Sequence, residues 1–216
     1  MIIGVIYKII LLFTLVKSYY LGKRFSFSAQ NFLFIYLLIT FINEYISFTR
    51  NLIDPNVRVG LQYNLYFIFC IFFFYYFFKK SCSKILRYLF FLNFIISIGC
   101  IIFFTKFLSL DFDKDIGIII LSYYIINCIL WFYHKVAFFD ENKITDDPVF
   151  WISTALLMWS CFFLFRITPM FYFAKEDEGF LLFLRIGQNT INIIMYIMFY
   201  ISLKKYEILI NESYSR

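Results

Sequence analysis

Apolar residues fill seven long stretches of this chain, and short polar segments separate one stretch from the next. An α-helix needs about 20 apolar residues to cross about 30 Å of hydrocarbon, and each stretch is close to that length. The stretches are residues 1–21, 31–49, 59–78, 85–107, 115–138, 148–172 and 180–203. The pattern predicts an all-α fold, a seven-transmembrane-helix bundle that forms one domain over residues 1–216.

The composition fits a membrane protein. Hydrophobic residues make up 62% of the chain, against about 45–50% in a typical soluble domain. The 33 Phe and 18 Tyr occur together with very few Ala, so we interpret the aromatic abundance as compositional bias and not as a dedicated function. The five cysteines are odd in number and include no C-x-x-C pair, so neither a disulfide framework nor a zinc site is predicted.

The basic residues predict how the chain crosses the membrane, because cytoplasmic loops are enriched in Lys and Arg. One set of connecting segments holds Lys17, Lys23, Arg24, Lys79, Lys80, Lys84, Arg87, Lys135, Lys143, Lys204, Lys205 and Arg216. The opposite set holds only Arg50, Arg58, Lys106, Lys114 and Lys175. We therefore expect the N-terminus outside and the C-terminus in the cytoplasm. The net charge of +6 follows from this asymmetry and gives no reason to expect nucleic acid as a partner.

Residues 1–21 differ from a secretory signal peptide. No basic region precedes their apolar run, and no small-x-small cleavage site follows it. The basic residues come after the span instead. We expect an uncleaved anchor with an exported N-terminus.

Four ionisable side chains fall inside the predicted spans, namely Lys8, Glu44, Arg166 and Arg185. Charged groups are costly in hydrocarbon, so they usually face the bundle interior and pair with one another. Counting residues from the span ends places all four in the outer half of the bundle.

The last span also carries a polar stripe. Arg185, Gln188, Asn189 and Asn192 follow i, i+3, i+4, i+7 spacing, which places them on one helix face. Lipid would not solvate that face, so we expect it to point inward. Asn64 opens the third span from the same outer side. The candidate ligand-binding residues are therefore Glu44, Asn64, Arg166, Arg185, Gln188, Asn189 and Asn192.

Three interpretations of these residues stay open. In one, Lys8 and Arg185 extend their charged ends toward the outer interface. In the structural one, Glu44 pairs with Arg166 or Arg185, and the amides join helices through ordinary hydrogen bonds. In the functional one, the groups line a cavity that opens to the outside. Since one acid would not neutralise three bases, that cavity would be net positive and would suit a carboxylate or a phosphate.

Sequence motifs for catalysis are missing. The chain has one histidine, His134, and it has no G-x-S-x-G, H-E-x-x-H or Walker A sequence. The last span has no lysine before Lys204 that could carry retinal as a Schiff base. We predict no catalytic residue, no metal site and no cofactor.

Three short segments carry a resemblance to a known group. They are Asn43-Glu44 in the second span, Asn64-x-Tyr66 at the start of the third, and Asp147-Pro148-x-Phe150-Trp151-Ile152 at the start of the sixth. In these, and in length and span order, the chain resembles small seven-helix membrane proteins of Bacteroidota. Related sequences often carry an acid six residues after the Asn, where this chain has Cys70. The resemblance implies a bacterial cytoplasmic (inner) membrane protein that serves as an input component beside a histidine kinase.

The leading hypothesis is a non-enzymatic sensory or signalling accessory protein of the lipid bilayer. An anionic or amphiphilic small molecule would enter from the outer side, where the arginines would bind its charge. A signalling protein would contact the basic inner segments at 79–87 or 204–216. The alternatives are a transporter of small solutes or lipids, a lipid-modifying enzyme that uses Glu44 as its acid or base, and a structural subunit of a complex.

Overall fold

The computed structural model describes residues 2–54, 58–138, 143–172 and 177–214. It is all-helical, with 88% of the residues in helix and seven α-helices. These are α1 Ile2–Arg24, α2 Leu33–Ile53, α3 Gly60–Lys80, α4 Lys84–Phe104, α5 Lys114–Ala137, α6 Pro148–Tyr172 and α7 Glu178–Tyr214, with short 3-10 helices at Phe27–Gln30 and Ile144–Asp146. Each predicted stretch corresponds to one α-helix, so the all-helical prediction is confirmed.

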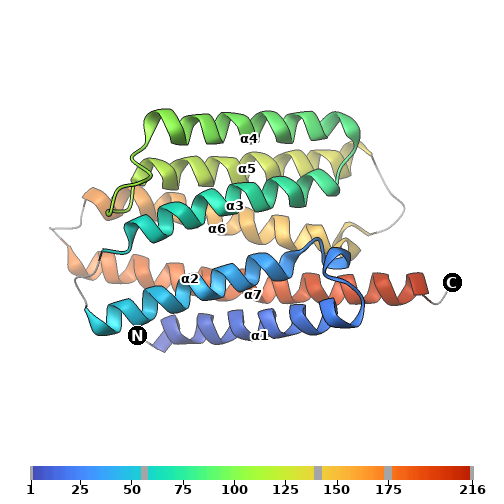
Figure 1. Ribbon diagram of the computed structural model, residues 1–216, viewed down its shortest axis with the longest axis horizontal. Coiled ribbons are helices and arrows are strands. Elements are labelled where there is room, and N and C mark those ends of the chain that lie inside the picture. The colour runs from blue at the N-terminus through green and yellow to red at the C-terminus, as the bar shows by residue number, and fades with distance from the viewer. Residues whose placement is uncertain (1, 55–57, 139–142, 173–176, 215–216) are drawn as a thin grey trace.

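The seven helices lie side by side along the long axis of the molecule (Figure 1). Successive contacts join α2 to α1, α1 to α7, α7 to α6, α6 to α5 and α5 to α4, while α3 contacts α2, α4 and α5. The bundle therefore closes on itself, and α1, α2, α3, α5, α6 and α7 can all contribute side chains to one interior space.

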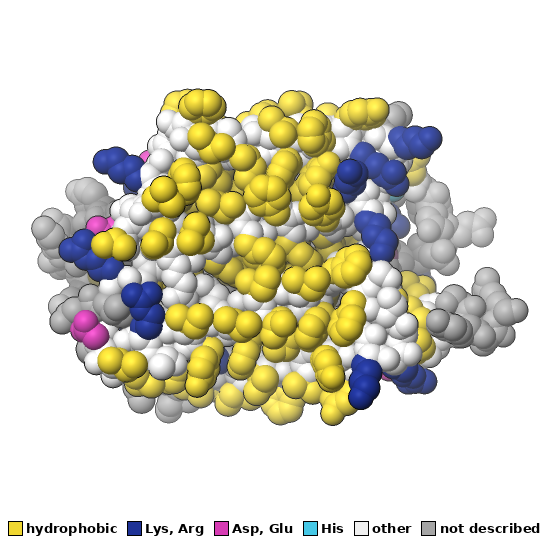
Figure 2. Space-filling view, in the orientation of Figure 1, with side chains coloured by type: hydrophobic (Ala, Val, Ile, Leu, Met, Phe, Trp, Pro, Cys, Tyr) yellow, Lys and Arg dark blue, Asp and Glu magenta, His cyan; other side chains and the backbone are white. Residues whose placement is uncertain are grey.

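Five helices are long and apolar enough to cross a membrane: Ile3–Arg24, Gly60–Lys80, Leu86–Phe104, Lys114–Ala137 and Pro148–Ile167. Hydrophobic side chains cover the middle of the face seen in Figure 2, and Lys and Arg gather at its two ends. This distribution suits a bilayer with water on both sides. Within the described residues, α2 and α7 fall outside the set of five, and these are the helices that carry Glu44 and the polar stripe.

The last helix runs further than its apolar stretch predicts. The apolar stretch ends at residue 203, but α7 continues to Tyr214 and is 37 residues long. Its C-terminal end projects past the other helices (Figure 1). Hydropathy marks the part of a helix that fits lipid and not the point where the backbone stops being helical.

Two basic residues of the predicted charge asymmetry, Lys175 and Arg216, lie outside the described residues.

Aromatic side chains form the centre of the bundle. Phe74 of α3 is fully buried, and its ring lies 5.0 Å from the ring of Tyr36 on α2 and 5.1 Å from that of Tyr124 on α5. Phe199 of α7, also fully buried, lies 5.9 Å from Tyr36. This packed layer lies behind the cavity described below, of which Tyr36 and Tyr124 form part of the wall.

Candidate functional site

A cavity of about 380 Å³ lies inside the bundle, between its middle and the end at which α1 begins. That volume is within the range of about 300–1,000 Å³ that small-molecule sites occupy. Six helices and the segment before α5 line it, with side chains of Tyr7, Tyr36, Thr40, Glu44, Tyr63, Tyr66, Phe67, Phe112, Tyr124, Leu156, Trp159, Phe163, Arg166, Gln188, Asn189, Asn192, Met195 and Tyr196.

The structure places five of the seven candidate residues in this lining, namely Glu44, Arg166, Gln188, Asn189 and Asn192. They come from α2, α6 and α7, which are distant in sequence and meet at one level. The lining residues as described do not include Asn64 and Arg185. Five of the candidate residues therefore lie around one cavity, and the positions of Asn64 and Arg185 are described below.

Glu44 is held by tyrosines. The hydroxyl of Tyr7 on α1 donates to Glu44 Oε2, and the hydroxyl of Tyr63 on α3 lies 3.5 Å from Glu44 Oε1. Tyr63 also donates to Ser47 Oγ at 3.1 Å. The expected pairing of this carboxylate with an arginine is not formed, because α1 and α3 flank α2 at this level and bring their phenols to it.

The two arginines differ in position. Arg166 is partly buried in the cavity wall, with its guanidinium carbon 5.8 Å from the ring centre of Phe163 one turn earlier on α6. Arg185 is exposed. The described lining therefore holds one acidic side chain, Glu44, and one basic side chain, Arg166, where the sequence indicated an excess of bases.

The polar stripe of α7 forms a hydrogen-bonded cluster. Asn192 Oδ1 accepts from Trp159 Nε1 at 2.8 Å and from Gln188 Nε2 at 3.2 Å. Gln188 is buried, and within the described residues its Oε1 has no hydrogen-bond partner. A buried acceptor of this kind costs free energy unless something donates to it. The cluster therefore keeps one amide acceptor beside the cavity unpaired in the described part of the chain.

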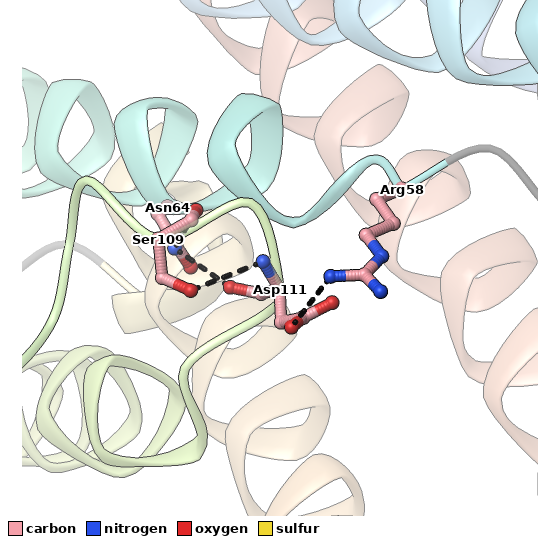
Figure 3. Close-up of polar contacts among 4 residues, drawn as sticks. All are labelled: Arg58, Asn64, Ser109 and Asp111. Atoms are coloured by element: carbon pink, nitrogen blue, oxygen red, sulfur yellow. Dashed lines mark hydrogen bonds and ion pairs between the residues drawn. The ribbon is translucent and has the colours of Figure 1, made fainter.

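Asn64 is fully buried at the start of α3 and contacts the segment between α4 and α5. Its amide nitrogen lies 3.3 Å from Asp111 O, and its Oδ1 accepts from Asp113 N at 3.3 Å. Figure 3 shows this contact beside the ion pair of Arg58 and Asp111, which are 3.4 Å apart. Asn64 therefore positions a segment that contributes a wall residue, Phe112, to the cavity.

The sequence analysis did not predict six tyrosines that line the cavity: Tyr7, Tyr36, Tyr63, Tyr66, Tyr124 and Tyr196. Attributing the aromatic abundance to composition concealed them. One signal was present, because Tyr36, Thr40 and Glu44 follow i, i+4, i+8 spacing on α2 and so share a helix face. Their hydroxyls and rings give the cavity both polar and apolar contacts, as in the pair of Thr40 and Tyr66, 2.8 Å apart.

The lining offers ion pairing, hydrogen bonding and aromatic contact. No metal-binding group of three or more His, Cys, Asp or Glu occurs in the described part of the chain. His134 lies away from the cavity, where its Nε2 accepts from the backbone of Ser83 at 3.3 Å.

No known family model, curated protein or solved structure matches this chain. Its function must therefore be argued from the cavity and the bundle themselves.

Proposed function

We propose that this protein is a membrane-embedded sensory or signalling accessory protein whose cavity binds a small amphiphilic molecule with a carboxylate or phosphate group. The observation that carries the proposal is the meeting of Glu44, Arg166 and the α7 amides around one cavity. Intramembrane ionisable groups usually mark functional sites. With one acid and one base in the described lining, a ligand with an anionic group and a separate donor fits better than a simple anion.

The parts of the ligand can be matched to parts of the wall. Arg166 would bind the anionic group, since a guanidinium donates two parallel hydrogen bonds to a carboxylate or phosphate. A donor on the ligand would bind an acceptor of the lining such as the carboxylate of Glu44 or the side-chain amide of Asn189. The rings of Trp159 and Phe163, stacked 5.0 Å apart on α6, would contact the apolar body.

The proposal includes seven transmembrane spans with the N-terminus outside, in a bacterial cytoplasmic membrane. The polar residues that lower the hydropathy of α2 and α7 include Glu44 and the α7 amides, which line the cavity and so avoid lipid. The described members of the richer basic set lie at the end opposite the cavity, so the cavity would face the outer side. The resemblance to Bacteroidota membrane proteins supports the same arrangement.

This orientation can be measured with single introduced cysteines. We expect Leu108→Cys, in the exposed segment between α4 and α5, to react with a membrane-impermeant maleimide on intact cells. Lys143→Cys, exposed at the opposite end, should react only after permeabilisation. The unmodified chain, with its own five cysteines, provides the background. The reverse labelling pattern would invert the topology.

The signal would leave through α7. This helix carries the cavity amides, and its other end is attached to the basic side of the bundle. There, the Glu207 carboxylate lies 2.5 Å from Lys17 Nζ and 3.8 Å from Arg24 Nη1. Lys205 Nζ lies 2.7 Å from Asp146 Oδ1. A signalling partner at this end would respond to a shift of α7.

Binding can be tested by the thermal shift of purified protein with a panel of alkyl and aryl carboxylates and phosphates. We expect Arg166→Gln to weaken binding of the best ligand roughly 10- to 150-fold, because a hydrogen bond to a charged group contributes about 1.5–3 kcal/mol. Arg185→Gln is the matched control, since Arg185 is exposed, and it should change affinity little.

Equal losses in both arginine variants, or unchanged affinity in Arg166→Gln, would contradict the site. Uptake of the same ligand into proteoliposomes would assign the cavity to transport. The depth of the cavity favours that alternative, because the cavity reaches Tyr124 and Trp159 near the middle of their helices.

A further inference from the structure

A second, larger hollow of about 590 Å³ lies away from the cavity, between the start of α2 and one face of α3. Six residues of its wall on α3, from Phe69 to Lys80, follow i, i+3, i+4, i+7, i+8 and i+11 spacing, and Lys79 lies beside them. Such residues share one helix face. The hollow is therefore a groove along the outer surface of the bundle and does not share lining residues with the cavity.

The groove has two chemically different parts. Its long part is aromatic, with Phe69, Phe72, Phe73 and Tyr76 on α3 facing Ile35 on α2. Phe72, Tyr76 and Ile35 are exposed in the isolated chain. From Phe69 to Lys80 the helix rises about 16 Å over eleven residue-to-residue steps, which is about half of the ~30 Å hydrocarbon thickness. The whole groove, from Phe69 to the basic residue Lys80, thus has about the depth of one leaflet.

The other part is a basic mouth formed by Lys79, Lys80 and Arg87. In the described part of the chain, none of the three forms an ion pair with an acidic side chain. Lys80 Nζ donates one hydrogen bond, to Ser28 O at 2.9 Å, and an ammonium has three donors. Arg87 Nε donates to Cys82 O at 3.1 Å, which leaves the rest of its guanidinium for another acceptor.

We infer that this groove binds an anionic glycerophospholipid of the leaflet on the basic side of the bundle. The phosphate would lie at Lys79, Lys80 and Arg87, and an acyl chain would follow the aromatic face of α3 toward Phe69. Basic pockets beside membrane helices select anionic headgroups in this way. Charge complementarity at the mouth and the aromatic surface below it, in a groove about one leaflet deep, together favour a lipid over a free anion.

Native mass spectrometry of the full chain can test the inference. Protein released from detergent is mixed with dioleoyl phosphatidylglycerol, with dioleoyl phosphatidylcholine, or with glycerol 3-phosphate alone. We expect a retained phosphatidylglycerol adduct, a much weaker phosphatidylcholine adduct and none with glycerol phosphate. The variant Lys79→Gln/Lys80→Gln/Arg87→Gln should weaken the phosphatidylglycerol adduct roughly 10- to 100-fold, given the attraction of each basic residue to anionic lipid.

Two further variants keep the result interpretable. Lys23→Gln/Lys143→Gln/Lys204→Gln removes the same charge from exposed positions at the same end but outside the groove, and it should leave the adduct unchanged. Ile35→Trp fills the aromatic part without changing charge and should weaken the adducts of both lipids. Since Ile35 is exposed, this variant should fold.

Equal losses in the two triple variants would show a general charge effect and overturn the inference. Binding of glycerol phosphate alone would overturn it in favour of a free-anion site. A species of two chains that disappears in Ile35→Trp would assign the groove to a second copy of the protein. None of these outcomes depends on whether the interior cavity binds a ligand.

Discussion

Tyr7→Phe is expected to destabilise the protein by about 1.5–3 kcal/mol, because a hydrogen bond to a charged acceptor contributes about that much. The hydroxyl of Tyr7 donates to the carboxylate of Glu44, and the only other hydroxyl near that carboxylate in the described structure is that of Tyr63, at 3.5 Å. Its loss leaves a charged group in a cavity wall with poorer support. Reversible unfolding in mixed micelles measures the change.

A double-mutant cycle isolates this interaction. In a Glu44→Leu background, Tyr7→Phe should have almost no effect, because the acceptor is already gone. Tyr45→Phe removes a hydroxyl from the residue next to Glu44, and Tyr45 is exposed on the outside of α2. It should leave stability unchanged. If Tyr7→Phe had the same effect with and without Glu44, the carboxylate would not be held by this phenol.

Gly60→Ala is expected to destabilise the protein by about 1–3 kcal/mol, the usual effect of forcing an extra carbon into a packed site. A Cβ at Gly60 would lie 2.1 Å from both the carbonyl carbon of Asp111 and the amide nitrogen of Phe112. These are backbone atoms that cannot rotate aside, so the whole segment would have to move. That movement would disturb the contacts of Asn64 and the cavity wall at Phe112.

Gly99→Ala in α4 is the matched control. A Cβ there meets no atom within 4 Å, so the variant should gain up to about 1 kcal/mol from helix propensity alone. Both substitutions place Ala in a helix and differ in whether backbone lies next to the new carbon. Thermal unfolding in detergent measures the stability of both variants. Equal stability would contradict the close packing of α3 against the segment before α5.

The helices and part of the cavity could be predicted from the sequence because both depend on local periodicity. Long apolar runs predict α1 to α7, and positions i+3, i+4 and i+7 counted from Arg185 bring Gln188, Asn189 and Asn192 to one side of α7. Arg185 belongs to the same stripe but is exposed. Residue spacing predicts on which face of a helix a side chain lies. It does not predict how far along that face the cavity extends.

The contacts of Glu44 and Asn64 could not be predicted because they depend on how separate helices are aligned along the bundle. Tyr7 is 37 residues from Glu44 in sequence, and Asp111 is 47 from Asn64. Nothing local indicates that a phenol, and not a guanidinium, reaches the carboxylate. Nor does local sequence show that Asn64 contacts a connecting segment while its neighbour Tyr63 lines the cavity.

The uninterrupted course of α7 has a consequence for any partner. At a rise of 1.5 Å per residue, its 37 residues measure about 55 Å, so in the proposed arrangement one continuous helix would join the two faces of the membrane. Coupling between two binding events is reciprocal. Under the proposed function, a partner that binds the projecting end of α7 would therefore change the affinity of the cavity for its ligand by the same factor by which the bound ligand changes the affinity of the partner, and the cell could adjust ligand sensitivity from the cytoplasmic side.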